Sequence, residues 1–342
     1  MLRALRQLVQ AWWATLTGRL RGQPRHPDWN PAFEAVVRFL LLDWIETSSW
    51  DFPRLRAAAD ARPYPKKWVR KVKLTTAQLG GVPAVRFVAR GGAKRGATVL
   101  FFHGGSYIFG SALTSHAELL ARLASETGVE VVGLDYRLAP EDVYPAQLDD
   151  ALAAFDALLD EGVPASSIVV GGDSAGGNLA VALGLRLRDR GGPVPRALAL
   201  LSPWVDLEMP GASYHENERY DFGRRQELVR HARAFAGALA LDDPRISVTH
   251  ARLAGLVPCF VTYGEAELPR DDIAAFVEHL REAGVEVTEH VAPAMPHNAA
   301  FFADFHPSAH AALDALLEFV KTSMEKGVSG KATGPGDVEC PP

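Results

Sequence analysis

The chain has 342 residues, of which 48% are hydrophobic and 23% charged, so it can bury a large core and has the composition of an ordinary soluble globular protein. The net charge of -5 gives no indication of the basic surface that nucleic-acid binding needs. The two cysteines, Cys259 and Cys340, are too few for a metal or disulfide framework, so we expect free thiols in a reducing compartment.

The first predicted element is an N-terminal helix with apolar residues at helical spacing. Five arginines precede the first acidic residue, Asp28. The apolar stretch from Leu8 to Leu16 is far too short to span a bilayer, and no signal-peptide cleavage site follows it. Two interpretations remain: a basic amphipathic helix on a lipid surface, or a cap helix packed over an active site. The pattern favours the cap, because such stripes more often serve packing.

The next elements change from a helical to a strand period. A second helix is predicted over 30–47, with Asn30 as its N-cap, and a hairpin around Gly80-Gly81. Short apolar strands then alternate with amphipathic helices, which predicts an α/β fold with an eight-stranded, mostly parallel sheet, its first two strands antiparallel, and helices on both faces. The strands are expected near residues 72–75, 85–88, 99–102, 129–134, 168–170, 197–201, 259–263 and 285–291. Further helices are expected over 115–125, 147–159, 226–241 and 310–319.

One long segment, between Leu201 and Cys259, contains no clear strand. An insertion of this kind usually forms a lid or a binding element. The last residues are rich in Gly, Pro, Ser and Lys, so we expect them to be disordered. The predicted division is therefore an N-terminal helical cap segment (1–65), a core in two parts (66–205 and 249–324), a cap insertion (206–248) and a disordered tail (325–342).

A serine between two glycines, Gly172 and Gly176, stands between an apolar strand and a helical pattern. The chain must reverse sharply there, which predicts a strained backbone at Ser174 and a hydroxyl lifted out of the chain. A side chain at either glycine would collide with neighbouring backbone. The alternative is a glycine-rich turn that contains serine by chance. A catalytic serine also needs a base, an acid and donors for an oxyanion.

Candidates for these partners follow other strands, whose carboxyl ends meet at one edge of a parallel sheet. Gly104 and Gly105 could turn backbone N–H groups into a cavity and, with the N–H of Ala175, hold an oxyanion. His103 beside them is interpreted as a residue that stabilises the loop. His297, after the last strand, is the candidate base.

The acid should follow the penultimate strand, where Glu265 and Glu267 lie in one loop. Asp271 or Asp272 is expected to cap the helix that comes next. The spacing leaves both glutamates open.

Together these motifs resemble the hormone-sensitive-lipase-like branch of the α/β-hydrolases, which includes bacterial carboxylesterases, arylacetamide deacetylases and fungal sterol deacetylases. The matching segments, within about residues 95–322, are His103-Gly104-Gly105, the run from Asp135 to Glu141, Tyr144-Pro145-Ala146, Gly172 to Gly177, Ser202-Pro203-Trp204 and Pro296-His297. The chain departs from the family at Ser106, where the family has a third glycine, and at Leu268-Pro269, where the usual order is reversed. When the last residue of the family's Asp-x-Leu-x-Asp pattern is aligned with Asp271, its first carboxylate falls on Glu267. The resemblance therefore favours Glu267 as the acid.

The resemblance implies a serine carboxylic-ester hydrolase that acts through an acyl-enzyme on a small to medium apolar ester. The implied site residues are Ser174 as nucleophile, His297 as base, Glu267 as acid, and Gly104, Gly105 and Ala175 as oxyanion donors. The alternatives are an acyltransferase or cyclising thioesterase with the same triad, and a non-catalytic small-ligand receptor. We expect no metal or cofactor, a small-molecule ester as the partner, and a cytoplasmic location in which only the N-terminal helix could touch a membrane.

Overall fold

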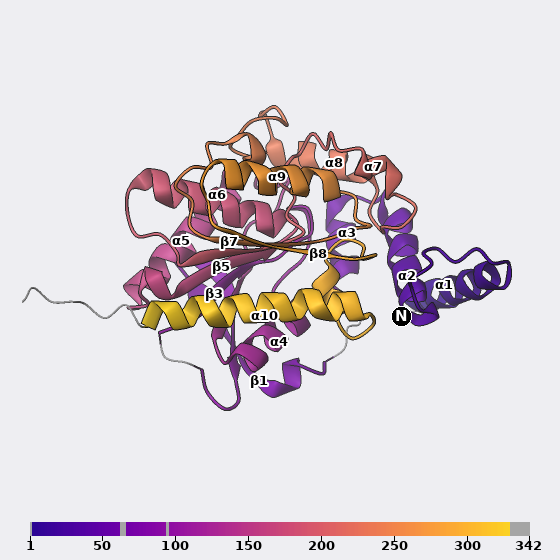
Figure 1. Ribbon diagram of the computed structural model, residues 1–342, viewed down its shortest axis with the longest axis horizontal. Coiled ribbons are helices and arrows are strands. Elements are labelled where there is room, and N and C mark those ends of the chain that lie inside the picture. The colour runs from indigo at the N-terminus through magenta and orange to yellow at the C-terminus, as the bar shows by residue number, and fades with distance from the viewer. Residues whose placement is uncertain (1, 62–65, 94–95, 329–342) are drawn as a thin grey trace, which may run out of the picture.

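The computed structural model describes residues 2–61, 66–93 and 96–328 (Figure 1). Its centre is an eight-stranded sheet with the order β1-β2-β4-β3-β5-β6-β7-β8. β2 pairs antiparallel with β1 and β4, and every other pair is parallel, so the predicted sheet is confirmed. The strands are β1 (Val72–Leu79), β2 (Val82–Ala89), β3 (Thr98–Phe102), β4 (Glu130–Leu134), β5 (Ile168–Asp173), β6 (Ala197–Leu201), β7 (Cys259–Gly264) and β8 (Val287–Ala292).

Helices cover both faces of the sheet (Figure 1). Neighbouring residues of a strand point to opposite faces, so Val169 packs with α4 and α10 while Val170 packs with α5, α6 and α9. Because both faces are buried, the central strands are apolar throughout rather than alternating. These five helices are α4 (Ala117–Thr127), α5 (Ala146–Asp160), α6 (Ala175–Arg190), α9 (Arg270–Glu282) and α10 (Pro307–Val328).

Several predicted helices have different ends in the structure. The helix expected over 226–241 is α8 (Arg225–Ala236), which stops where Gly237 adopts a positive φ. The helix expected over 310–319 is the longer α10, so residues 325–328 are helical and not part of a disordered tail. The rest of the predicted tail, with Cys340, lies outside the described residues. Cys259 is a buried free thiol, as expected.

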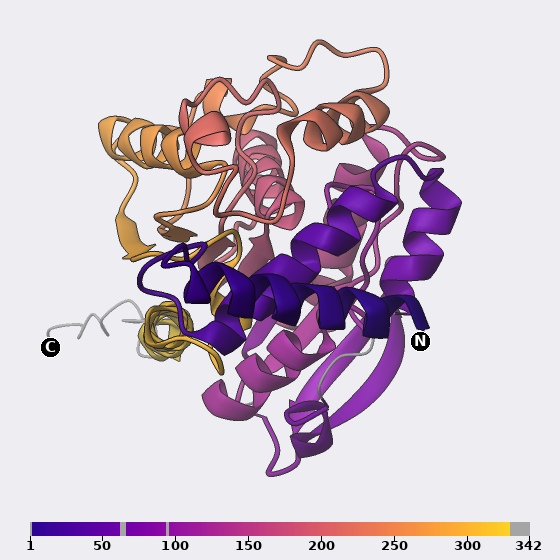
Figure 2. The ribbon, with the colours of Figure 1, turned by 90° about the vertical axis from the view of Figure 1, so that its right-hand side faces the viewer.

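Three helices precede the sheet: α1 (Leu2–Leu20), α2 (Pro31–Thr47) and α3 (Phe52–Asp60). The side chain of Asn30 accepts the N–H of Phe33, which confirms the predicted cap of α2. The apolar pattern did not predict α3, a short helix capped by Asp51. Figure 2 shows α1 lying across the outer side of α2.

The α2 segment packs against the loop that follows β8. Trp29, Phe33 and Val37 form one apolar cluster with Met295 and Phe302. The indole N–H of Trp29 also donates to the carbonyl of Ala294 at 2.7 Å. This packing joins the start of the chain to its last loop, at the carboxyl edge of the sheet.

Candidate functional site

Ser174 stands at a sharp turn between β5 and α6, with φ 53° and ψ −119°. The strained backbone predicted there is confirmed. A Cβ on Gly172 would overlap the carbonyl of Gly176, and one on Gly176 would overlap the carbonyl of Phe102. Glycine is therefore required at both places, and the close packing holds the serine at the carboxyl edge of the sheet.

The structure brings His297 and Glu267 together across two loops, one after β8 and one after β7. His297 Nδ1 lies 3.0 Å from Glu267 Oε2. The Glu267 side chain is fully buried. Glu265 is exposed, and its carboxylate accepts the backbone N–H of Ala294 instead. Of the two candidate acids, only Glu267 contacts the histidine.

The surroundings shift the pKa values of both Glu267 and His297. Burial raises the pKa of Glu267, although hydrogen bonds from His297 and Ser202 oppose that shift. Burial alone would lower the pKa of His297, but the hydrogen bond and charge of Glu267, with Asp221 and Asp173 nearby, raise it above its usual value. A ring held in this way is oriented to accept a proton on Nε2 and to be stabilised as a cation.

Asp221 is a buried carboxylate from the insertion, and sequence reasoning missed it. Oδ2 accepts the N–H of Leu268 at 2.8 Å, and Oδ1 accepts the N–H of His297 at 3.2 Å and of Phe222 at 2.8 Å. The Arg25 guanidinium donates to the backbone carbonyl of Asp221 at 2.8 Å. One side chain therefore ties the acid loop and the histidine loop together. Its segment has no regular pattern, so no sequence signal marked it.

The predicted role of Gly104 as an oxyanion donor is contradicted by the structure. Its N–H donates to Asp173 Oδ1 at 2.9 Å and lies 3.2 Å from His116 Nε2. The following residues, Gly105 and Ser106, have positive φ values of 112° and 54°. The chain therefore turns away from the direction of β3 directly after Gly104, whose N–H is bound by Asp173.

Free donors do lie beside this loop. Within the described part of the chain, no hydrogen bond uses the N–H of Gly105, Ser106 or Ala175 as its donor. Ala175 is the first residue of α6, where an N–H has no partner inside the helix. Sequence reasoning had noted Ser106 only as a departure from a third glycine. Its N–H replaces that of Gly104 as the candidate.

His103 supports the loop, as predicted. Its ring is buried and stacks on Tyr136 with centroids 4.3 Å apart, and Nδ1 lies 2.7 Å from the carbonyl of Gly104. Burial and the neighbouring His116 lower the pKa of His103 to about 4, so the ring is neutral at pH 7.

Ser174 and His297 line one cavity of about 570 Å³. The N-terminal helix α2, the loop after β3, the insertion and the short helix η4 (Ala299–Phe302) all contribute to its walls. Its large apolar lining residues are Val36, Phe39, Leu40, Trp44, Trp68, Phe109, Leu119, Trp204, Phe222, Leu228, Leu268, Phe301, Phe302 and Phe305. Such a lining suits an apolar group next to the reacting atoms.

The preferred interpretation of the first helix as a cap over the site is wrong. Among the α1 side chains that the structure describes, none lines the cavity. The face of α1 that is buried carries Gln7, Ala11 and Thr15, and the apolar stripe points outward. It is α2 that covers the site.

Asp271 and Asp272 do not cap α9, contrary to the prediction, because the helix begins at Arg270 and has no side-chain cap. Their carboxylates accept backbone N–H groups of the insertion: Asp271 that of Ser213 at 2.8 Å and Asp272 that of Gly211 at 3.0 Å. Both residues therefore fasten the insertion to the start of α9.

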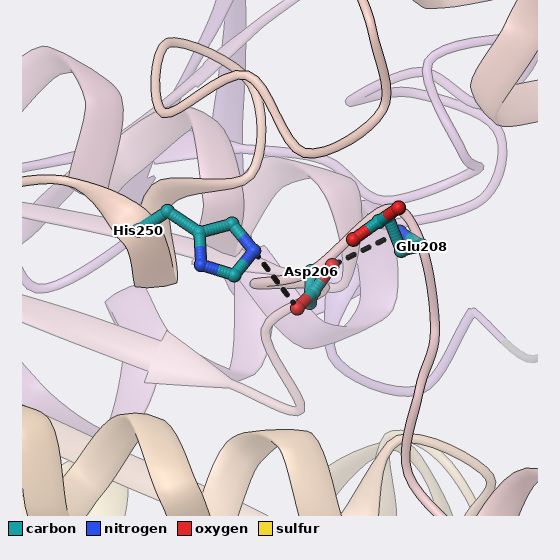
Figure 3. A group of neighbouring side chains, drawn as sticks. All are labelled: Asp206, Glu208 and His250. Atoms are coloured by element: carbon teal, nitrogen blue, oxygen red, sulfur yellow. Dashed lines mark hydrogen bonds and ion pairs between the residues drawn. The ribbon is translucent and has the colours of Figure 1, made fainter.

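A second group of titratable side chains consists of Asp206, Glu208 and His250 (Figure 3). None of the three is among the residues that line the cavity. His250 Nε2 lies 3.3 Å from Asp206 Oδ2, and the other oxygen of Asp206 accepts the N–H of Glu208 at 2.9 Å. Asp206 is buried, and each of its two carboxylate oxygens already has a partner in His250 or Glu208. These contacts therefore stabilise the segment that follows β6.

Comparison with known proteins places this arrangement among characterised folds. A family model described as the α/β-hydrolase fold matches residues 99–301. An acetyl-hydrolase of Streptomyces hygroscopicus is 36% identical over 234 residues, which are 68% of this chain and 78% of that protein. An esterase of Acinetobacter venetianus is 33% identical over 258 residues, covering 74% and 83% of the two chains.

Solved structures agree. The crystal structure of an esterase from the bacterial hormone-sensitive lipase family is 32% identical, with a TM-score of 0.77 over 83% of this chain and 97% of its own. A hormone-sensitive lipase from a metagenome library is 32% identical, with a TM-score of 0.76 over 84% and 97% of the two chains.

Proposed function

This chain belongs to the hormone-sensitive-lipase branch of the α/β-hydrolases and is a carboxylic-ester hydrolase, and we propose that Ser174, His297 and Glu267 carry out its reaction. The observation that carries the proposal is the 3.0 Å contact between His297 and the fully buried Glu267, beside a serine in a strained turn that lines the same cavity. These are the parts that acyl transfer requires.

The proposed first step forms an acyl-enzyme. Ser174 Oγ attacks the ester carbonyl carbon while His297 Nε2 takes the hydroxyl proton. Glu267 holds the ring through Nδ1 and stabilises the imidazolium that forms. When the tetrahedral intermediate collapses, the carbon–oxygen bond to the alcohol breaks, and His297 returns the proton to the leaving oxygen.

The second step reverses these roles with water. His297 takes a proton from a water molecule, and the hydroxyl attacks the acyl carbonyl. The bond to Ser174 then breaks to release the acid, and His297 returns the proton to Ser174 Oγ. In both steps we assign the oxyanion to the N–H groups of Gly105, Ser106 and Ala175, which have no acceptor within the described residues. A single donor of this kind is worth about 10²–10³ in rate.

The cavity supports a small to medium apolar ester as the substrate. Its volume of about 570 Å³ and the aromatic and aliphatic side chains from α2 and the insertion match an apolar acyl or alcohol group. The hydrolysis of a series of p-nitrophenyl esters of increasing acyl length measures this preference. A maximum of kcat/KM at acetate to hexanoate is expected, and a maximum at long-chain esters would contradict the assigned size.

The nucleophile is tested with Ser174→Ala. Turnover of p-nitrophenyl butyrate should fall by about 10⁶-fold, because the variant has no group to acylate. A fluorophosphonate probe should label the wild-type chain and not the variant. Labelling that persists in Ser174→Ala, or unchanged turnover, would place the nucleophile elsewhere.

A further inference from the structure

Helix α1 buries the opposite face from the one that its sequence pattern predicts. Gln7, Ala11 and Thr15, spaced four residues apart, are buried against the body of the protein. Small and polar side chains on this face let the helix lie close to α2, which it crosses at an angle (Figure 2). The contact leaves the large apolar side chains of α1 on the exposed side of the helix.

The outward face carries seven large apolar residues, here called the α1 apolar stripe. Their exposed fractions range from 38% at Trp12 to 87% at Leu20, and that of Trp13 is 70%. The stripe consists of Leu5, Leu8, Val9, Trp12, Trp13, Leu16 and Leu20. A contiguous apolar patch of this extent marks an interaction site rather than an ordinary surface.

Ion pairs to α2 set the rotation of α1. Arg3 pairs with the buried carboxylate of Asp43 at 2.9 Å, and Arg19 pairs with Glu34, also buried, at 2.8 Å. Because these pairs lie at both ends of the helix, α1 cannot turn its stripe inward without breaking an ion pair to a buried carboxylate at each end. The outward stripe is therefore a property of the packed helix pair.

Exposed basic charge lies at both ends of the stripe, although carboxylates of α2 pair with Arg3, Arg6 and Arg19. The first 27 residues contain five arginines and no acidic residue, although the whole chain has a net charge of -5. Arg21 is exposed and forms no ion pair with any residue that the structure describes, and Arg6 is more than half exposed. Tryptophan and leucine side chains flanked by arginine are the composition of helices that lie in the headgroup region of anionic membranes.

We propose that α1 docks this protein on the surface of an anionic lipid bilayer, with the helix axis in the plane of the membrane and the α1 apolar stripe in the headgroup region. Among the described helices, none is both long and apolar enough to cross a bilayer. A second copy of the chain fits the stripe less well, because a twofold contact would bring the arginines of one α1 close to those of the other.

This docking would place the membrane on the outer side of α2, whose opposite side lines the cavity through Val36, Phe39, Leu40 and Trp44. The proposal does not depend on the assigned reaction, because it concerns residues outside the cavity. It can therefore be tested by binding, with hydrolysis of a water-soluble ester serving only to show that each variant is folded.

The experiment is co-sedimentation of the full chain with vesicles of phosphatidylcholine alone and of phosphatidylcholine mixed with phosphatidylglycerol. Binding to the mixed vesicles is expected, and Trp13→Gln with Leu16→Gln should weaken it by at least about tenfold, because two apolar side chains no longer leave water. Arg21→Gln should weaken it by about fivefold, and high salt should remove that difference. The matched control is Val194→Gln with Val291→Gln, two residues that are 37% and 41% exposed elsewhere, which should bind like wild type.

Two outcomes would overturn the proposal. One is the absence of co-sedimentation with either vesicle composition, or equal binding by the α1 and control variants. The other is a concentration-dependent dimer in light scattering that Trp13→Gln with Leu16→Gln dissolves while vesicle binding is absent, which would assign the stripe to a second copy. All variants should hydrolyse p-nitrophenyl butyrate at the wild-type rate without vesicles.

Discussion

Replacing Glu267 with glutamine tests the proposed acid most directly. The carboxylate is fully buried and 3.0 Å from His297 Nδ1, so the substitution changes charge and hydrogen bonding but hardly changes volume. The amide can donate to Nδ1, which would put the ring proton on Nε2, the nitrogen that must accept the proton of Ser174. The stabilisation of the imidazolium is lost at the same time.

The expected loss in kcat/KM is about 10³- to 10⁴-fold, or about 4 to 5 kcal/mol of transition-state stabilisation. The assay is p-nitrophenyl butyrate hydrolysis as a function of pH. The base must be neutral, so kcat/KM in the wild type should fall as the pH drops through the His297 pKa, which lies above its usual value. In Glu267→Gln the largest factor that raises this pKa is gone and burial lowers it, so the acid limb should move to lower pH.

The matched control is Glu265→Gln. Glu265 is exposed, and its contact with the N–H of Ala294 survives because an amide oxygen also accepts a hydrogen bond. Less than about a threefold change is expected. A larger loss in Glu265→Gln than in Glu267→Gln, or an acid limb that does not move in Glu267→Gln, would refute the assignment. Thermal unfolding of both variants separates a loss of chemistry from a loss of fold.

Two further substitutions test the parts that position the site. Asp221→Asn changes the carboxylate that accepts the N–H groups of Leu268 and His297. We expect kcat to fall by about 10- to 100-fold with KM nearly unchanged. A change in KM alone would mean that Asp221 only shapes the cavity. Gly105→Ala puts a Cβ at φ 112° against the carbonyl of Phe109, which would displace the proposed oxyanion donors. Its kcat should fall by at least about 10²-fold while acylation by a fluorophosphonate also slows, and wild-type rates of both would contradict the assigned oxyanion loop.

Much of the fold could be predicted from local patterns. The five central strands, β3 to β7, follow from short apolar runs, because a strand buried on both faces has no polar alternation. The turn at Ser174 follows from Gly172 and Gly176, since the sterics of a strand-to-helix reversal act within a few residues. The helix cap at Asn30 is likewise local, and the structure confirms it.

Other predictions failed because they depend on which side chain lies nearby in space. Gly104 is a glycine after a strand, yet its N–H is held by Asp173, a residue on a different strand. Asp271 has the sequence position of a helix cap, but its carboxylate holds Ser213 of the insertion. The apolar stripe of α1 predicted burial, whereas the buried face is the one that lets the helix approach α2 closely.

By itself, the sequence determined the sheet, the serine turn and the chain order of serine, acid and histidine, because periodicity and glycine sterics operate over a few residues. Only the tertiary structure decided that Glu267 rather than Glu265 contacts His297, that Asp221 joins the two loops, and that α2 rather than α1 covers the cavity. These outcomes depend on directions of side chains and backbone N–H groups from segments far apart in the chain, which no local pattern records.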